Sequence, residues 1–373
     1  MKTTAITLAA LAFSLLTAQG APKGETLRES LGKHFLIGCA MSVPQTEGQL
    51  PREAQIAATQ FNAVVPENCM KAGEIQPREG VFKWGASDSL VRFAETHGMV
   101  VTGHCLIWHS QAPGWFFTGH DGREVSRDTL LARMRRHIHA VVGRYKGRIH
   151  GWDVVNEAFN DDGTLRQTPY LRIIGPDYFE YAFRYAHEAD PDAELYYNDY
   201  SMALPRKRAA VCRLVRTLKA KGCRIDAVGM QSHNGMDYPN LKEYERTMDS
   251  LAACGVKVMV TELDINVLPN PEGFSGAEIS QNFEMQRKFN PYPTQLPKSV
   301  YKQWEKRCLD IFDIYLRHRH QISRVTLWGV TDAGSWLNGW PVPGRTNYPL
   351  LFGRDNKPKP VVKKIIRMFD AVQ

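Results

Sequence analysis

The sequence predicts an α/β protein, a single closed (β/α)8 barrel of the TIM type with a long loop after its seventh strand. Short apolar runs of strand type alternate with longer amphipathic stretches, roughly every 40 residues, and this pattern favours parallel strands joined by helices. Eight such runs occur, which is the number that closes a barrel. An open doubly wound sheet would show fewer strands and a glycine-rich first turn, which this sequence lacks.

The expected strands and helices follow one another along the chain with suitable ends. The apolar runs predict strands over Phe35–Ala40, Ala63–Pro66, Val100–Trp108, Ile149–Val155, Glu194–Tyr197, Ala227–Gln231, Lys257–Thr261 and Arg324–Trp328. The amphipathic stretches predict helices over Ser87–His97, Ser126–Tyr145, Asp177–Glu188, Pro205–Ala220, Leu241–Cys254 and Lys302–Leu316. Ser126 stands at a cap position, Pro205 suits a first turn, and Gly222 suits the residue after a helix end.

One segment, between Asn266 and Ser299, departs from this alternation of strands and helices. It is rich in Pro, Asn and Gly and shows no clear periodicity. Loops of more than about 15 residues in a compact domain are usually functional. We expect a long loop after the seventh strand, with a short helix near Ile279–Arg287. No linker marks a second domain, so residues 21–373 are expected to form one barrel.

The chain begins in the manner of an exported protein. Lys2 precedes an apolar run from Ala5 to Thr17, and small residues follow up to Ala21. These three features are typical of a signal peptide, which we place at residues 1–20. An uncleaved anchor is the alternative, although the run is shorter than the roughly 20 apolar residues that cross a membrane. We expect a secreted or periplasmic monomer with no membrane span in the mature chain.

Charge and cysteine content argue against several other classes of protein. The net charge is +8 and the isoelectric point is about 9.0, so polyanions are candidate partners. The Lys and Arg residues are scattered over the expected helices, however, and we expect no nucleic-acid partner. Seven cysteines form no Cys-x-x-Cys pair, so we expect no metal site. Because the number is odd, at least one thiol stays unpaired, and Cys39 and Cys105 lie in apolar runs that suit buried thiols.

Polar and aromatic residues gather where the expected strands end. The strand ends carry Glu67, Asn68, Lys71, His104, Trp108, Asn156, Glu157, Tyr200, Gln231, His233, Glu262, Asp264 and Trp328. In a barrel these ends face one mouth, where active sites lie. One polar strand end is usually only a turn, but six or seven that converge indicate a functional site.

Two carboxylates in this mouth suit acid–base and nucleophilic chemistry. Glu157 and Glu262 each follow an apolar run of a buried strand, the fourth and the seventh. A desolvated Glu has a raised pKa and can donate a proton, whereas a Glu supported by hydrogen-bond donors stays ionised and can attack. Two such groups about 5 Å apart are what retaining glycosidases use. Either Glu alone would more simply be an ion-paired rim residue, so the pair carries the hypothesis.

Six motifs, in order along the chain, make the hypothesis more specific. They are PENCMK, GHCLIWH, WDVVNEA, MQSHNG, TELDI and WGVTDAGSW. Together they resemble family 10 of the glycoside hydrolases, the xylanase family, and the resemblance runs from about Phe35 to Phe369. It implies a (β/α)8 barrel that hydrolyses xylan or xylo-oligosaccharides with retention and needs no cofactor.

The resemblance also implies roles for individual residues. Glu157 would be the acid/base and Glu262 the nucleophile, with Asn156 on the 2-hydroxyl of the reacting sugar. His233 would contact the nucleophile and be held by Asp264. The other implied contacts with sugar involve His104, Trp108 and Gln231 at the reacting sugar, Glu67, Asn68 and Lys71 at the next sugar outward, Trp328 and Trp336 as an apolar cage, and Tyr200 on the leaving-group side.

Some positions depart from the family pattern, and two alternatives stay open. Cys69 stands where the family commonly has an acidic residue, and Ala72 replaces a common Trp. A related barrel acting on β-1,4-glucan or mannan would share both catalytic Glu, and a non-catalytic glycan-binding barrel could have lost one of them. The retention of Glu67, Asn68 and the tryptophan cage favours an endo-1,4-β-xylanase.

Overall fold

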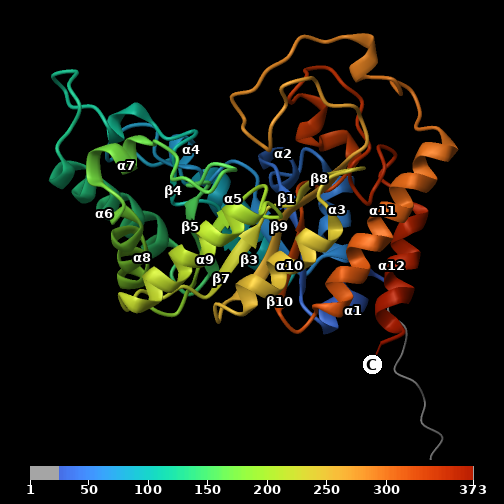
Figure 1. Ribbon diagram of the computed structural model, residues 1–373, viewed down its shortest axis with the longest axis horizontal. Helices are drawn as coiled ribbons and strands as arrows, with labels where there is room; N and C mark the ends of the chain where they lie inside the picture. Colours follow the sequence, from blue (N-terminus) through green and yellow to red (C-terminus); the bar gives the residue numbers. More distant parts are fainter. Residues whose placement is uncertain (1–24, 373) are drawn as a thin grey trace, which may run out of the picture.

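The computed structural model describes residues 25–372 and shows a closed barrel of eight parallel strands (Figure 1). The strands are β1 (Leu36–Met41), β2 (Ala63–Pro66), β3 (Val100–Gly103), β5 (Gly151–Asn156), β6 (Glu194–Asp199), β7 (Ala227–Met230), β9 (Lys257–Asn266) and β10 (Ile322–Leu327). They pair in this order, and β10 pairs with both β9 and β1, which closes the barrel. The fold predicted from the sequence is confirmed.

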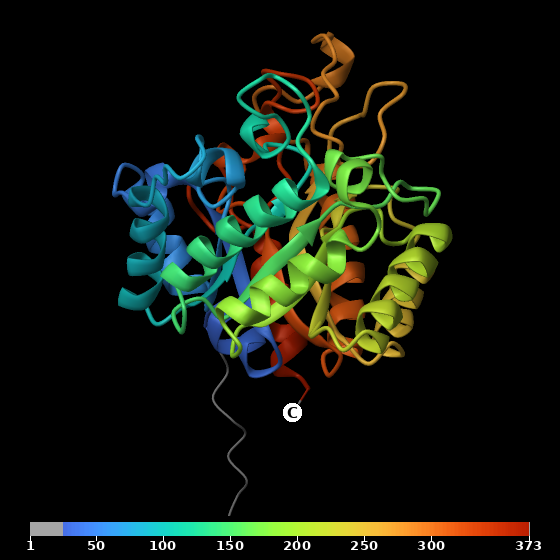
Figure 2. The same cartoon turned by 90° about the vertical axis from the view of Figure 1, so that its left-hand side faces the viewer.

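Helices surround the barrel, and Figure 2 shows them packed outside the strands. The longer helices are α3 (Pro51–Gln60), α5 (Gly85–Thr96), α6 (Arg127–Arg144), α8 (Tyr178–Ala189), α9 (Pro205–Ala220), α10 (Leu241–Ala252), α11 (Lys298–Arg317) and α12 (Pro360–Asp370). Short ones are α1 (Leu27–Ser30), α2 (Val43–Thr46), α4 (Ala72–Ile75) and α7 (Pro169–Ile174). The Ser126 hydroxyl accepts from the Thr129 amide and caps α6, as predicted. Strands covered in this way are buried on both faces, which explains their continuous apolar runs.

Two strands differ from their predicted extents by more than two residues, and both differences shape the mouth. The third predicted strand is interrupted after Gly103 and resumes as β4 (Ile107–Trp108), which pairs with β5. The seventh strand runs beyond the predicted end at Thr261 to Asn266, because β8 (His233–Gly235) provides it with a second parallel partner. As a result, Glu262 and Asp264 lie within a strand rather than in a turn.

The long loop exists, but the short helix predicted near Ile279–Arg287 is wrong. The described chain has only a 3-10 turn in this loop, η3 (Arg287–Phe289). The backbone makes hydrogen bonds to a neighbouring loop instead of within a helix: the Phe283 amide donates to the Pro341 carbonyl at 2.9 Å. These cross-loop bonds use the donors and acceptors that a helix would require. The loop (orange in Figures 1 and 2) lies at the end of the barrel opposite the C-terminus.

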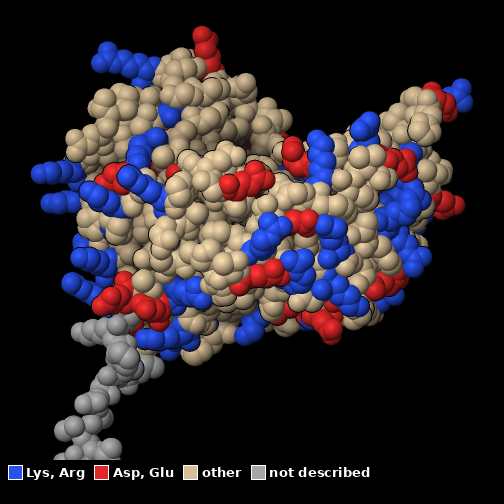
Figure 3. Space-filling model, turned by 180° about the vertical axis from the view of Figure 1, so that it is seen from behind, with Lys and Arg blue, Asp and Glu red and all other residues tan. Residues whose placement is uncertain are grey.

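The cysteines and surface charges fit the expectations from composition. All seven cysteines are buried free thiols. Acidic and basic side chains are interspersed over the face seen in Figure 3. Within residues 25–372 no helix is long and apolar enough to cross a membrane. The predicted signal peptide at residues 1–20 lies outside the described residues.

Candidate active site

The two predicted carboxylates are buried at the mouth of the barrel. Glu157 follows β5, and Glu262 lies in β9. Glu157 has a φ of 56°, a left-handed conformation that is unusual for a residue with a side chain and often marks a functional site. Both residues are about one-twentieth exposed. Their protonation is therefore set by the groups around them rather than by bulk water.

Glu157 is tuned towards the protonated state. Burial is the largest influence on its pKa, and the charges of Asp199 and Glu262 act in the same direction. Hydrogen bonds from Gln231 and Trp108, both 2.8 Å long, oppose these effects by favouring the carboxylate. The net result raises the pKa of Glu157 to about 7. A group with this pKa can donate a proton in one step and accept one in the next at neutral pH.

Glu262 is tuned in the opposite direction. Burial acts to raise its pKa, but hydrogen bonds and nearby positive charge outweigh burial and hold the pKa below its usual value. His233 Nε2 lies 3.1 Å from one carboxylate oxygen, and the Asn198 amide donates to the other at 2.8 Å. An ionised carboxylate next to a protonated one is the arrangement that separates a nucleophile from an acid.

A buried chain of charged groups supports Glu262. His233 Nδ1 lies 3.0 Å from the Asp264 carboxylate, which also accepts from the Trp336 indole at 2.8 Å. Burial alone would lower the pKa of His233, but the two carboxylates raise it to about 10. His233 is therefore an imidazolium between Asp264 and Glu262, and both of its ring nitrogens donate.

Amide side chains connect the two carboxylates. The Asn198 amide that donates to Glu262 also donates to Asn156 at 3.0 Å. The Gln231 amide that donates to Glu157 lies 3.4 Å from the same Asn156 oxygen. Asn156 is thus oriented by two donors. Its own side-chain nitrogen is buried and has no protein partner among the described residues, so it can donate to a bound hydroxyl.

One wall of the mouth combines a cation with aromatic rings. The Lys71 ammonium donates to Asn68 at 2.8 Å and lies 5.1 Å from the centre of the Trp108 ring. His104 is fixed by a 2.8 Å hydrogen bond to Asp153 and meets the Trp328 ring edge-on at 5.5 Å. Hydrogen-bonding edges beside aromatic faces suit sugars, which present hydroxyls at the ring edge and C–H groups on the ring face.

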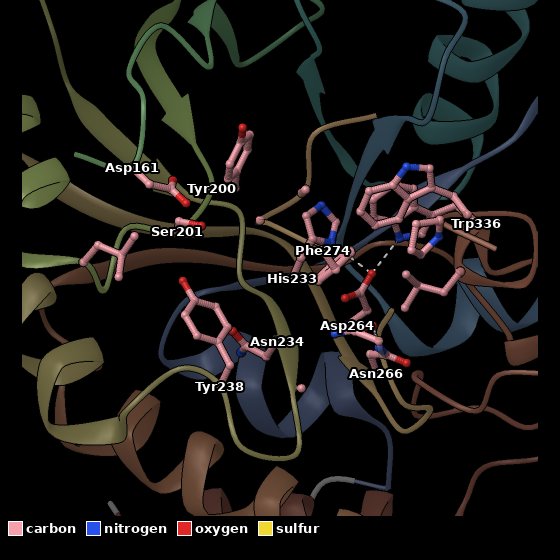
Figure 4. Close-up of a pocket in the computed structure, with 18 residues that line it drawn as sticks. Asp161, Tyr200, Ser201, His233, Asn234, Tyr238, Asp264, Asn266, Phe274 and Trp336 are labelled. Carbon is pink, nitrogen blue, oxygen red and sulfur yellow. Dashed lines mark hydrogen bonds and ion pairs between the residues drawn. The ribbon is translucent and has the colours of Figure 1, made fainter. Parts of the chain in front are cut away.

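Ten of the fourteen candidate residues line one cavity of about 50 Å³. They are Lys71, His104, Trp108, Asn156, Glu157, Gln231, His233, Glu262, Trp328 and Trp336. Tyr200 and Asp264 line an adjoining cavity of about 350 Å³, where Figure 4 shows Tyr200 and Trp336 on opposite sides. Glu67 and the exposed Asn68 directly follow β2, beside Lys71. Within residues 25–372, no group of three or more His, Cys, Asp or Glu could hold a metal ion.

Comparison with known proteins identifies the family. The family model for glycosyl hydrolase family 10 matches residues 26–368. The chain belongs to glycosyl hydrolase family 10. The family predicted from the six motifs is therefore confirmed.

Individual relatives are similar over nearly the whole chain. Endo-1,4-beta-xylanase A of Xylanibacter ruminicola is 56% identical over 345 residues, 92% of this chain and 94% of that protein. An endo-1,4-beta-xylanase of Geobacillus stearothermophilus is 39% identical over 92% of this chain and 98% of that protein. Among solved structures, a family 10 endoxylanase from a sugarcane soil metagenome has a TM-score of 0.89 and 44% identity, covering 92% of this chain and 99% of that one.

The structure adds residues to this family 10 site that the motifs did not predict. Asn198 donates to Glu262, and its position directly before Asp199 and Tyr200 at a polar strand end was a usable signal. Ala277 and Ile279 of the long loop line the same cavity as both glutamates. Arg166 is joined to Glu278, 112 residues away along the chain, and no periodic pattern connects the two segments.

Proposed function

We propose that the protein is a retaining endo-1,4-β-xylanase, which hydrolyses internal β-1,4-xylosidic bonds of xylan with Glu157 as acid/base and Glu262 as nucleophile. The observation that carries this proposal is the opposite tuning of two buried carboxylates in one pocket, with one pKa raised to about 7 and the other lowered. The xylanases among the relatives, at 56% and 39% identity, support the choice of substrate.

The proposed reaction takes two steps. In the first, Glu157 protonates the glycosidic oxygen while a Glu262 oxygen attacks the anomeric carbon, and the leaving chain departs from a covalent xylosyl-enzyme. In the second, the ionised Glu157 takes a proton from water, which attacks the anomeric carbon and releases Glu262. Each step inverts the configuration at the anomeric carbon, so the product keeps the β configuration of the substrate. Both roles of Glu157 require a pKa near the working pH, which its burial provides.

The neighbouring residues would prepare these steps. The imidazolium of His233 keeps Glu262 ionised before attack and fixes the plane of its carboxylate, and Asp264 keeps that imidazolium charged. Asn156, oriented by two amides, would donate to the 2-hydroxyl of the reacting sugar. A hydrogen bond at this hydroxyl strengthens as positive charge develops on the ring, so it would favour the transition state.

Substrate binding is proposed to follow the chemistry of the two walls. Lys71 and Asn68 present charged and polar groups for the hydroxyls of the next sugar outward. Trp328 and Trp336 would enclose the faces of the reacting ring and leave no room for bulk at its C5 position. Xylo-oligosaccharides would suit these walls, and a similar solved structure, 33% identical with a TM-score of 0.82, is of a mutant in complex with xylotriose.

We also propose that the protein is exported and acts as a monomer. The basic, apolar and small-residue pattern of residues 1–20 is that of a signal peptide, and residues 21–373 would form the mature barrel. Expression in a bacterial host, followed by N-terminal sequencing of the protein outside the cytoplasm, tests this directly. A mature protein that still begins at Met1 would contradict the cleavage.

The proposed function is tested by digestion of xylan with product analysis. We expect a ladder of short xylo-oligosaccharides whose newly formed reducing ends are β-anomers when first observed by NMR. Rates on carboxymethylcellulose and mannan measure the two alternative substrates, and both should be far below the rate on xylan. Initial release of α-anomers, or faster hydrolysis of mannan or carboxymethylcellulose, would contradict the proposal.

A further inference from the structure

The long loop contributes a roof to the catalytic pocket. Ala277 is only 3% exposed and lines both the pocket that holds Glu157 and Glu262 and the adjoining larger cavity. His233 and Trp336 line both cavities as well. These three residues therefore surround a neck between the two cavities, with Ala277 as the contribution of the long loop.

The pocket under this roof has little room for an internal stretch of its proposed substrate. Its volume is about 50 Å³, and one water needs roughly 10–15 Å³ of such space, so the pocket holds only a few waters. Because each water fills about 30 Å³ of liquid, a few waters occupy about the space of one pyranose ring, and no room is left for a chain that continues on both sides. An internal stretch of polysaccharide has no free end to pass through a narrow neck, so the roof has to lift before such a stretch can bind.

An ion pair holds the roof against the segment that follows the acid/base. The Glu278 carboxylate lies 2.7 Å from an Arg166 guanidinium nitrogen, and the two side chains are only 25% and 18% exposed. Arg166 also donates to the Tyr200 hydroxyl at 2.5 Å and to the main-chain carbonyl of Glu157 at 3.2 Å. One guanidinium thus connects the roof, the acid/base segment and the leaving-group wall.

A close backbone contact fixes the other side of the roof. Gly276 lies against the Tyr200 ring, and a Cβ atom added to Gly276 would come within 2.5 Å of that ring. With a φ of 56°, Gly276 also has a left-handed backbone that suits glycine. While the roof is down, Tyr200 is covered by the backbone of the loop, so lifting the roof exposes the leaving-group wall together with the pocket.

We propose that Glu278 is a specificity-determining residue: its ion pair with Arg166 holds segment 276–279 over the neck and thereby limits attack within the xylan chain. This inference rests on the proposed xylanase function. With the pair formed, the pocket admits chain ends and short oligosaccharides. With the pair broken, pocket and cavity join into one groove that takes an internal stretch. Partly exposed ion pairs are modest in strength, so this one can open during turnover.

The matched test compares two neutralised carboxylates on the same loop. Glu278→Gln removes the charge that pairs with Arg166 but keeps the oxygen that accepts from the Ser280 amide. Glu284→Gln changes an exposed carboxylate of the loop and serves as the control. The readout is the fall in xylan viscosity per reducing end released, which is larger when bonds are cut within the chain. We expect this ratio to rise roughly threefold in Glu278→Gln, as the free energy of one partly exposed ion pair implies. In Glu284→Gln the ratio should stay at the wild-type value. An unchanged ratio in Glu278→Gln would overturn the proposal.

Amide hydrogen exchange without substrate separates this inference from the proposed function. Exchange over residues 276–279 should be faster in Glu278→Gln than in the wild type or Glu284→Gln, because the roof opens more often. Equal exchange in all three proteins would refute the proposed latch even if the wild type hydrolyses xylan. A wild type that releases no reducing ends from xylan would instead contradict the proposed function, and the exchange data would still decide whether Glu278 holds the roof.

Discussion

The two sides of the reacting centre are built in different ways. The wall with Lys71, His104 and Trp108 comes from the ends of barrel strands and the residues just after them, fixed by the barrel's hydrogen bonds. The proposed leaving-group side is covered by loops: Tyr200 directly follows β6 but lies beneath segment 276–279, and Arg166, which lies in a loop, joins the two. The difference teaches that the chemistry is placed by the barrel, whereas access to it is controlled by loops.

The largest effect should come from β9, the strand that carries the proposed nucleophile. Replacing Glu262 with Ala removes the group proposed to form the covalent intermediate, so kcat on xylan should fall on the order of 10⁴-fold or more. The thermal midpoint of unfolding, followed by circular dichroism, is the control for an intact barrel. Substantial turnover by the folded variant would show that this strand does not supply the nucleophile.

A smaller loss is expected when the proposed acid/base is neutralised. Glu157→Gln should lower kcat on xylan by about 10²- to 10⁴-fold, because the leaving sugar then departs without a proton. Formation of the xylosyl-enzyme from an aryl β-xylobioside with an acidic phenol should be much less affected, since such a phenol leaves as an anion. Equal losses on both substrates would contradict the role as acid.

The same residue sets the sign of the pH dependence. Glu157 must be protonated for the first step, and its pKa is raised to about 7, so the wild-type rate should fall as the pH rises through that value. Glu262 must be ionised and its pKa is lowered, so the acid limb should begin below the usual range for Glu. The pH–rate profile of Glu157→Gln checks this, because the fall in rate at alkaline pH should be absent from that variant.

An intermediate effect is expected at the positioning residue Asp264. Asp264→Asn keeps the shape of the side chain but removes the charge that raises the pKa of His233. A hydrogen bond to a charged group is worth about 1.5–3 kcal/mol, so kcat should fall roughly 10- to 100-fold. The acid limb of the pH profile should move to higher pH, because Glu262 loses the imidazolium that favours its ionised form. An unmoved acid limb would leave Asp264 with a packing role only.

The smallest effect is expected on the loop side. Tyr200→Phe keeps the ring under Gly276 but removes the hydroxyl that accepts from Arg166. Arg166 keeps the Glu278 carboxylate and the Glu157 carbonyl as acceptors, so kcat/KM on xylan should change only about 2- to 10-fold, and less on an aryl xylobioside. A loss as large as that of Asp264→Asn would remove the distinction between the barrel side and the loop side.

The sequence predicted the barrel side well for a physical reason. Each strand is a buried apolar run, and a closed barrel brings the residue after each run to one mouth, so Glu157, Trp108 and Lys71 could be grouped without coordinates. The loop side has no such periodicity. Its conformation depends on contacts between distant segments, such as the Phe283 amide on the Pro341 carbonyl and Glu278 on Arg166. The helix predicted near Ile279–Arg287 was wrong because the local sequence pattern does not reveal bonds to distant segments.

Trapping of the covalent intermediate tests most directly whether the barrel strand supplies the nucleophile. A 2-deoxy-2-fluoro xylobioside with a good leaving group slows the second step more than the first, so the glycosyl-enzyme should accumulate. Peptide mapping by mass spectrometry should find one adduct, on Glu262, and none in Glu262→Ala. An adduct on another carboxylate, or inactivation without any adduct, would contradict the double displacement proposed for this pair of glutamates.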